Sequence, residues 1–105
     1  MYLIICTTTD NIDVANMISE CILSKKYSPC VQIISNISSH YIWENKINKS
    51  IEYKIDIKTI SVYRNKVIDI IKNNHNYDIP EIIISEIEIL NKEYKDWFES
   101  TIRKE

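Results

Sequence analysis

The pattern that most constrains the fold is a strict alternation of apolar or hydroxyl side chains with charged ones over residues 51–59. The inward positions are Ile51, Tyr53, Ile55, Ile57 and Thr59, and the charged positions between them are Glu52, Lys54, Asp56 and Lys58. Because successive side chains of a β-strand point to opposite faces, this spacing predicts a strand with one buried face and one face in water. The other elements must therefore be arranged around a half-buried strand.

Three more strands and three helices are predicted on the two sides of this strand. In chain order they lie at 2–8 (strand), 11–26 (helix, capped by Thr9 or Asp10), 30–43 (strand), 61–74 (helix), 81–89 (strand) and after the cap Asn91 (helix). A turn at 44–46 joins the two middle strands. The order β-α-β-β-α-β with a terminal helix predicts an α+β, ferredoxin-like sandwich with a long central hairpin, formed by residues 1–105 as a single domain.

Residue spacing also predicts which side chains of these elements face the core. Inward positions are expected at Val31, Ile33, Tyr41 and Trp43 in the long strand, and at Val62, Val67, Ile70 and Ile71 in the second helix. In the last helix, Tyr94, Trp97 and Phe98 share one face.

Composition assigns the chain to the soluble globular proteins. Of its 105 residues, 45% are hydrophobic and 27% are charged, with 13 basic residues against 15 acidic ones. This balance provides no basic field for nucleic acid or an anionic membrane, and the longest apolar run, 2–6, is too short for a signal peptide or a membrane span. Cys6, Cys21 and Cys30 are odd in number and lack CxxC spacing, which predicts reduced thiols and a cytoplasmic location.

The complete absence of glycine restricts both the turns and the chemistry. Turns that need a positive φ must use another residue, and asparagine is the usual substitute. A glycine-rich phosphate loop is excluded, and the sequence contains no G-x-S-x-G, HExxH or CxxC motif. Because no pair of nucleophile and base can be named, we do not expect an enzyme.

The two middle strands are too long for a compact domain of this size. Each has roughly 14 residues, which corresponds to about 46 Å at ~3.3 Å per residue. A compact chain of this length has a diameter of roughly 33 Å. The hairpin must overhang its own domain or bend sharply, and an overhang would leave Tyr41, Ile42 and Trp43 near its tip in water. Pairing with other copies removes this exposure, so we expect a homo-oligomer.

The predicted order of elements places several reactive side chains at one end of the sheet. Cys6, near the end of the first strand, and His75, after the second helix, share this end with Thr8, Asp10, Tyr77, Glu81 and the tip 43–46. A thiolate and an imidazole form a pair suited to Cu(I) or Zn(II). The alternative is that Cys6 is a small buried side chain and that His75 is a hydrogen-bonding loop residue.

Several motifs extend over nearly the full chain. They are Cys30-Val31-Gln32-Ile33, the hairpin residues Ser39, Tyr41, Trp43, Asn45 and Lys46, the pair Lys58-Thr59, the stretch His75-Asn76-Tyr77-Asp78-Ile79-Pro80-Glu81-Ile82, and Tyr94 with Trp97. In this order and spacing they resemble the motifs of CutA, the divalent-cation-tolerance protein family.

The resemblance implies a ferredoxin-like homotrimer with a role in tolerance to copper and other divalent metal ions. The copper ligands proposed for the family are a cysteine at the end of the first strand and histidines just before the conserved tyrosine, and these positions match Cys6 and His75. The chain departs from the family pattern at Asn74 (histidine in some members), Asn76 (proline), Asn36 and Asn45 (turn glycines).

The leading hypothesis is a cytoplasmic homotrimer that binds copper or a similar divalent cation, has no obligatory cofactor and contributes to metal-ion tolerance. The alternative is a small-ligand-binding signalling trimer that resembles PII-type regulators. Its ligand would occupy an inter-subunit pocket formed by Trp43, Lys58, Tyr77 and Glu81. A third hypothesis is a structural scaffold. Neither nucleic acid nor a membrane is an expected partner.

Overall fold

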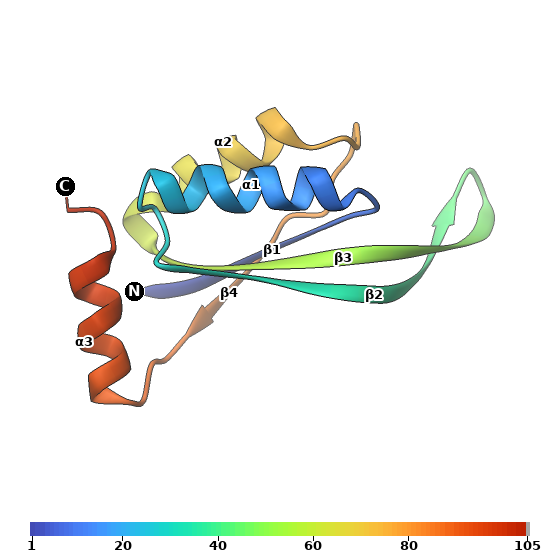
Figure 1. Cartoon of the computed structure of the whole chain (residues 1–105). Helices are drawn as coiled ribbons and strands as arrows, with labels where there is room; N and C mark the ends of the chain where they lie inside the picture. Colours follow the sequence, from blue (N-terminus) through green and yellow to red (C-terminus); the bar gives the residue numbers. More distant parts are fainter. Residues whose placement is uncertain (105) are drawn as a thin grey trace.

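The computed structural model describes residues 1–104, and Figure 1 shows how their helices and strands are arranged. The elements are β1 (Tyr2–Thr9), α1 (Ile12–Ser24), β2 (Cys30–Trp43), β3 (Lys46–Ile60), the 3-10 helix η1 (Ser61–Tyr63), α2 (Arg64–Asn74), β4 (Ile83–Ile87) and α3 (Lys92–Thr101). The strands form one antiparallel sheet in the order β2-β3-β1-β4. This order confirms the ferredoxin-like sandwich with an added C-terminal helix.

Helices α1 and α2 lie on one face of the sheet and enclose the main core with it (Figure 1). The fully buried side chains of this core are Ile5, Ala15, Ile18, Ile22, Ile55, Ile57, Val67 and Ile71. Burial of an isoleucine or valine side chain is worth about 1.5–3 kcal/mol relative to exposure. The core therefore depends on β1 and on the half of β3 that lies under the helices. No helix within residues 1–104 has the length and apolar character needed to cross a membrane.

Local capping determines where α1 begins and ends. The side chain of Asn11 accepts hydrogen bonds from the backbone N–H groups of Asp13 and Val14, so the N-cap lies one residue later than expected. At the other end Lys26 has a φ of 58°, the left-handed conformation in which many helices end. The N–H of Arg103 donates to the carbonyl of Lys26 at 2.7 Å, which ties the C-terminal segment to this end of α1.

Helix α3 packs against the opposite face of the sheet, near the start of β1 (Figure 1). Phe98 is fully buried, and its ring meets the ring of Tyr2 edge-on with the centroids 5.6 Å apart. The amine of Lys58 lies 5.7 Å from the centre of the Tyr94 ring, in a cation–π contact. Trp97, predicted to share the buried face, remains 43% exposed. The part of this face beyond α3 carries no other helix of residues 1–104 (Figure 1).

A β-bulge interrupts the long hairpin on the β2 side. The register passes from the pair Ile34–Lys54 to the pair Ile37–Glu52, so β2 contains one residue more than β3 between these pairs. Asn36, within the bulge, has a φ of 64°. Asparagine tolerates this left-handed region better than most residues with a Cβ atom. The expectation that Asn36 adopts the positive φ of the glycine that it replaces is confirmed.

The turn at the tip of the hairpin also uses positive φ values without glycine. Trp43 pairs with Lys46, so Glu44 and Asn45 form a two-residue turn, with φ values of 51° and 61°. Two central residues with positive φ are the requirement of a type I′ turn, whose twist matches that of the flanking strands. Asn45 therefore occupies the second left-handed position that the sequence predicts.

The hairpin extends past both helices and forms the long axis of the molecule (Figure 1). The described chain measures 46 × 26 × 20 Å. Beyond the bulge, apolar side chains are exposed to solvent: Tyr41 is 44%, Trp43 53%, Ile51 54%, Ile42 76% and Ile47 83% exposed. The prediction that Tyr41, Trp43 and Ile51 face the core is wrong for two reasons. The extra residue of the bulge moves Tyr41 and Trp43 to the same face as Glu52, opposite to α1 and α2. Ile51 keeps its predicted face, but the helical layer ends before it reaches this residue.

Two element boundaries differ from the prediction for physical reasons. The second helix begins with the 3-10 turn η1, which has three residues per turn, and this places Tyr63 in the core while Val62 is 52% exposed. Strand β4 ends at Ile87 because this residue pairs with Tyr2, the first residue of its partner β1.

Replacing Asn36 tests the left-handed bulge. We predict that Asn36→Ala lowers the free energy of unfolding by about 1 kcal/mol, because alanine has no polar side chain that eases this conformation. Asn36→Gly should cause no loss, since glycine adopts positive φ without a Cβ penalty. Urea unfolding at one fixed protein concentration measures both variants. Equal stabilities of Asn36→Ala and the wild type would contradict the assignment.

Candidate functional site

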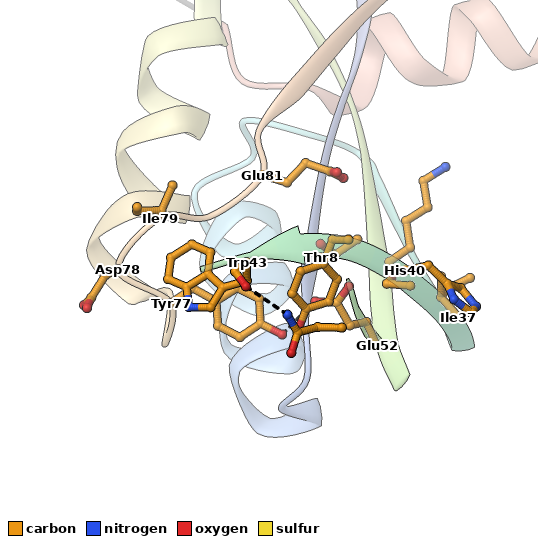
Figure 2. Close-up of a pocket in the computed structure, with 13 residues that line it drawn as sticks. Thr8, Ile37, His40, Trp43, Glu52, Tyr77, Asp78, Ile79 and Glu81 are labelled. Carbon is orange, nitrogen blue, oxygen red and sulfur yellow. Dashed lines mark hydrogen bonds between the residues drawn. The ribbon is translucent and has the colours of Figure 1, made fainter. Parts of the chain in front are cut away.

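A hollow of about 900 Å³ lies between the distal hairpin and the loop that leads from α2 to β4 (Figure 2). It opens on the sheet face opposite to α1 and α2, because Lys54 of its wall alternates along β3 with the core residue Ile55. Its walls come from the end of β1, the distal parts of β2 and β3, and residues 77–81 of the loop. The side chains able to recognise a ligand are the aromatic Tyr41, Trp43 and Tyr77, the carboxylates of Glu52, Asp78 and Glu81, and the bases His40 and Lys54.

A hydrogen bond between Tyr77 and Glu52 joins the loop to the hairpin inside the hollow. The hydroxyl of Tyr77 donates to Oε2 of Glu52 at 2.7 Å, and Glu52 is only 7% exposed. Burial and this bond to a carboxylate raise the pKa of the Tyr77 hydroxyl, so it stays protonated and donates at neutral pH. The alternating pattern places Glu52 on the wet face, and the contact with a residue 25 positions away buries it.

The loop before Tyr77 is held to β1 by the side chain of His75. Nδ1 of His75 accepts the backbone N–H of Tyr77 at 3.0 Å, so the ring proton lies on Nε2. Nε2 then donates to the carbonyl of Thr8, 2.8 Å away. Both ring nitrogens are engaged, and His75 fixes the direction in which Tyr77 enters the hollow.

Asn76 adds a second clamp at the position where the CutA pattern has proline. Its Nδ2 donates to Oδ1 of Asp10 at 2.8 Å, and its Oδ1 accepts the hydroxyl of Thr9 at 2.6 Å. Two side-chain hydrogen bonds thus replace the restriction of φ that a proline ring supplies.

The His75 imidazole favours its neutral form. Desolvation by burial lowers its pKa below the ordinary value near 6.5. The hydrogen bond to Thr8 and the negative charges of Asp10 and Glu52 oppose this shift but do not cancel it.

Cys6 lies on the sheet face opposite to the helices, because its neighbour Ile5 points into the core. Its side chain is buried, with 9% exposed. Desolvation raises the pKa of the thiol to about 11; the positive charge of Lys54 lowers it, while Asp56 and Glu81 raise it further. At neutral pH the thiol of Cys6 is therefore protonated when no metal is present, and it would have to release this proton to bind a metal ion.

Cys6 and His75 share an end of the sheet, but both ring nitrogens of His75 are used in other contacts. The thiol is neutral and faces away from the helices, and neither nitrogen of His75 has a free lone pair. Within residues 1–104, no three His, Cys, Asp or Glu side chains form a group that could hold a metal ion. The described part of a single subunit therefore holds no ready-made group of three ligands, and the assignment of Cys6 and His75 as metal ligands stays a prediction.

Three of the four residues expected in a ligand pocket do line the hollow. These are Trp43, Tyr77 and Glu81. Lys58 does not line the hollow. It pairs with Ile4, near the start of β1, and its amine lies against the ring of Tyr94 in α3.

The amine that lines the hollow belongs to Lys54, which lies four residues before Lys58 on the same strand. Sequence reasoning missed this lysine together with Glu52, Asp78 and His40 as lining residues. Asp78 lies inside the matched loop motif, which is the one signal that could have identified it.

The fold and the hollow define a ferredoxin-like α+β protein with an overhanging hairpin and a ligand-sized site between this hairpin and the loop that leads from α2 to β4. The sequence model of the family described as CutA1 divalent ion tolerance protein matches residues 3–101. The chain belongs to this family.

Individual relatives agree with the family assignment. The chain is 30% identical over 102 residues to the protein CutA 1, chloroplastic, of Oryza sativa subsp. japonica. The alignment covers 97% of this chain but only 58% of that protein. The crystal structure of CutA1 from Oryza sativa superposes with a TM-score of 0.92 at 30% identity, over 99% of this chain and 95% of that one. The structure of the periplasmic divalent cation tolerance protein CutA from Archaeoglobus fulgidus gives a TM-score of 0.91 at 34% identity, over 98% of this chain and 100% of that one.

These relatives correct the expectation of a cytoplasmic location. The Archaeoglobus fulgidus protein is named as periplasmic, so the family resemblance does not point to the cytoplasm. They also do not favour the alternative of a PII-type regulator, since each is named CutA and none of the three as such a regulator.

The lowered pKa of His75 predicts a pH-dependent stability. As the pH falls below about 6.5, the imidazole takes up a proton in the unfolded chain before it does so in the folded chain. The free energy of unfolding should therefore decrease as the pH decreases, until the pH passes the lower pKa of the folded state. Denaturant unfolding between pH 7.5 and pH 5 at fixed protein concentration measures the slope.

Two matched variants identify the group responsible. His75→Gln should be less stable at pH 7.5 and should lose part of the slope, whereas His40→Gln, on the exposed hairpin, should keep it. An unchanged slope in His75→Gln would show that the imidazole is not the group that titrates.

Proposed function

We propose that the protein contributes to tolerance of divalent metal ions as a homotrimer of this chain and catalyses no reaction. Membership of a family described by divalent ion tolerance supports the role, and the relatives compared above are named as tolerance proteins rather than enzymes. The trimer is the assembly that the resemblance to CutA implies. The observation that carries it is the apolar surface of the hairpin.

The distal hairpin is unstable as a solitary ribbon. Ile42 and Ile47, paired across the strands near the tip, are 76% and 83% exposed, and Trp43 is 53% exposed. A two-stranded ribbon in water is marginally stable, and contiguous exposed apolar side chains of this kind are typical of protein interfaces.

A second copy of the chain is the partner with matching features. β2 and β4 are the edge strands of the sheet, so each subunit offers unpaired strand edges on both sides. Exposed apolar side chains lie beside β4 as well, at Ile83 (53%) and Leu90 (84%). Closed rings form when one subunit uses two different surfaces in this way.

The mass of the protein in solution tests the assembly. Sedimentation equilibrium should give about three times the chain mass of 12.5 kDa over a wide range of dilution. Ile42→Lys combined with Ile47→Lys should lower this mass, because two charges at the tip cannot be buried without partners.

Val62→Lys provides the matched control. Val62 is 52% exposed, but it lies in η1, which follows the end of β3 opposite to the hairpin tip, and its substitution should leave the mass unchanged. A folded, stably monomeric wild type would contradict the proposal.

The proposal includes the binding of copper or a similar cation. The donors of this metal site are residues other than the pair Cys6 and His75. The hydrogen bonds that occupy both ring nitrogens of His75 support this proposal. Donors contributed by more than one subunit are the remaining source of a complete ligand set.

Titration with Cu(I) against a competing chelator separates the residues. The wild type, Cys6→Ala and His75→Ala should take up the same amount with the same affinity. Cys21→Ala and Cys30→Ala control for uptake by the two more accessible thiols. Loss of one bound equivalent in both Cys6→Ala and His75→Ala would restore the pair as ligands.

A further inference from the structure

We propose that the hollow between the distal hairpin and the loop 77–81 binds a small organic cation, an ammonium or guanidinium group carried on a partly apolar body. This inference goes beyond metal-ion tolerance and is tested independently of the number of subunits. It rests on a buried negative charge, on the sign of the surrounding charges and on the aromatic walls.

The buried charge is the carboxylate of Glu52. Oε2 accepts the hydroxyl of Tyr77, but this donor is neutral, so the bond satisfies one oxygen and leaves the charge unbalanced. Within residues 1–104, Glu52 forms no ion pair, and Lys54 lies instead 3.8 Å from Asp56. Acidic side chains that are 7% exposed are almost always paired with a cation, because an uncompensated charge is costly to bury.

The other charges around the hollow have the same sign. The carboxylates of Asp78 and Glu81 also line it, against the single amine of Lys54. Glu52 belongs to β3, whereas Asp78 and Glu81 both belong to the loop 77–81, and Figure 2 shows the carboxylate of Asp78 directed away from Glu52. The negative charge of the hollow therefore comes chiefly from Glu52, with the loop carboxylates at its rim. An excess of one sign in a recessed site raises the local concentration of the opposite ion.

Aromatic rings supply the remaining walls. Tyr41, Trp43 and Tyr77 line the hollow. The faces of aromatic rings attract cations, and quaternary and primary ammonium groups are bound in this way. Ile37 and Ile79 add apolar surface for the body of such a ligand.

A bare metal ion fits this site less well. The described residues include no group of three metal-binding side chains, and aromatic faces offer a divalent ion no donor atoms. The volume of about 900 Å³ is instead in the range of small-molecule sites. Carboxylates that set the charge and aromatic rings that enclose an apolar body together select an organic cation.

Choline chloride and agmatine sulfate are suitable probes. Binding is followed by the fluorescence of Trp43 in a Trp97→Phe background, with the full chain in its native assembly. Both probes should quench the signal saturably, whereas sodium butyrate, an anion of similar size, should not.

Charge and ring are tested separately. Glu52→Gln should weaken binding about tenfold, and Glu86→Gln, a matched exposed carboxylate on β4, should leave it unchanged. Trp43→Leu, followed by calorimetry, should weaken binding as well, while Trp97→Leu should not. Trp43 lies outside the core, so this variant remains informative if Glu52→Gln fails to fold.

Three results would overturn the proposal: no saturable response to either probe, wild-type affinity in both Glu52→Gln and Trp43→Leu, or equal binding of butyrate. Displacement of choline by Mn²⁺ with the same dependence on Glu52 would replace it with a metal site. Sedimentation of the same samples keeps a loss of assembly distinct from a loss of binding.

Discussion

The pairing of β2 with β3 continues well past the helices that cover the sheet, and this mismatch of lengths shapes the molecule. A helix of 13 residues, such as α1, spans about 20 Å at ~1.5 Å per residue. Strands of 14 and 15 residues span about 46–50 Å at ~3.3 Å per residue. Two helices lying next to each other on the sheet cannot enclose such a hairpin, so its distal half must find cover elsewhere.

The candidate site lies where the helical cover ends. His75 and Asn76 attach the loop after α2 to the end of β1, and this attachment directs Tyr77 onto Glu52. The result is a buried carboxylate on a face that the strand pattern assigns to water. A protein that evolved only for stability would gain by replacing such a charge with an uncharged side chain. Its presence beside three aromatic rings is therefore the strongest local sign of binding.

Most of the fold was predictable because its signals are local. The alternation in β3 and the order of elements specify the sheet, and β2 has the predicted bounds Cys30–Trp43. The left-handed positions at Asn36 and Asn45 follow from the absence of glycine. The orientation of the distal side chains was not predictable in this way. The bulge at Asn36 reverses the alternation of β2 and moves Tyr41 and Trp43 to the other face, and the alternation in β3 does not say how far the helices reach.

The site was less predictable because its contacts join distant segments. Glu52 is buried by a residue 25 positions away, and no pattern within β3 reveals this. Lys58 and Lys54 occupy the same face of one strand, so choosing between them requires the register against β1. Cys6 and His75 were rightly placed at one end of the sheet, but the hydrogen bonds that occupy both ring nitrogens of His75 join distant segments and could not be foreseen from the sequence.

The central claim is that the distal hairpin is covered by other copies of the chain. Hydrogen exchange of the backbone amides of residues 37–51 tests it most directly. In the assembled protein these amides should be protected to a degree comparable with the amides of β1 and of the proximal half of β3. Exchange at the rate of a free two-stranded ribbon, in protein that is otherwise folded and protected, would contradict the account.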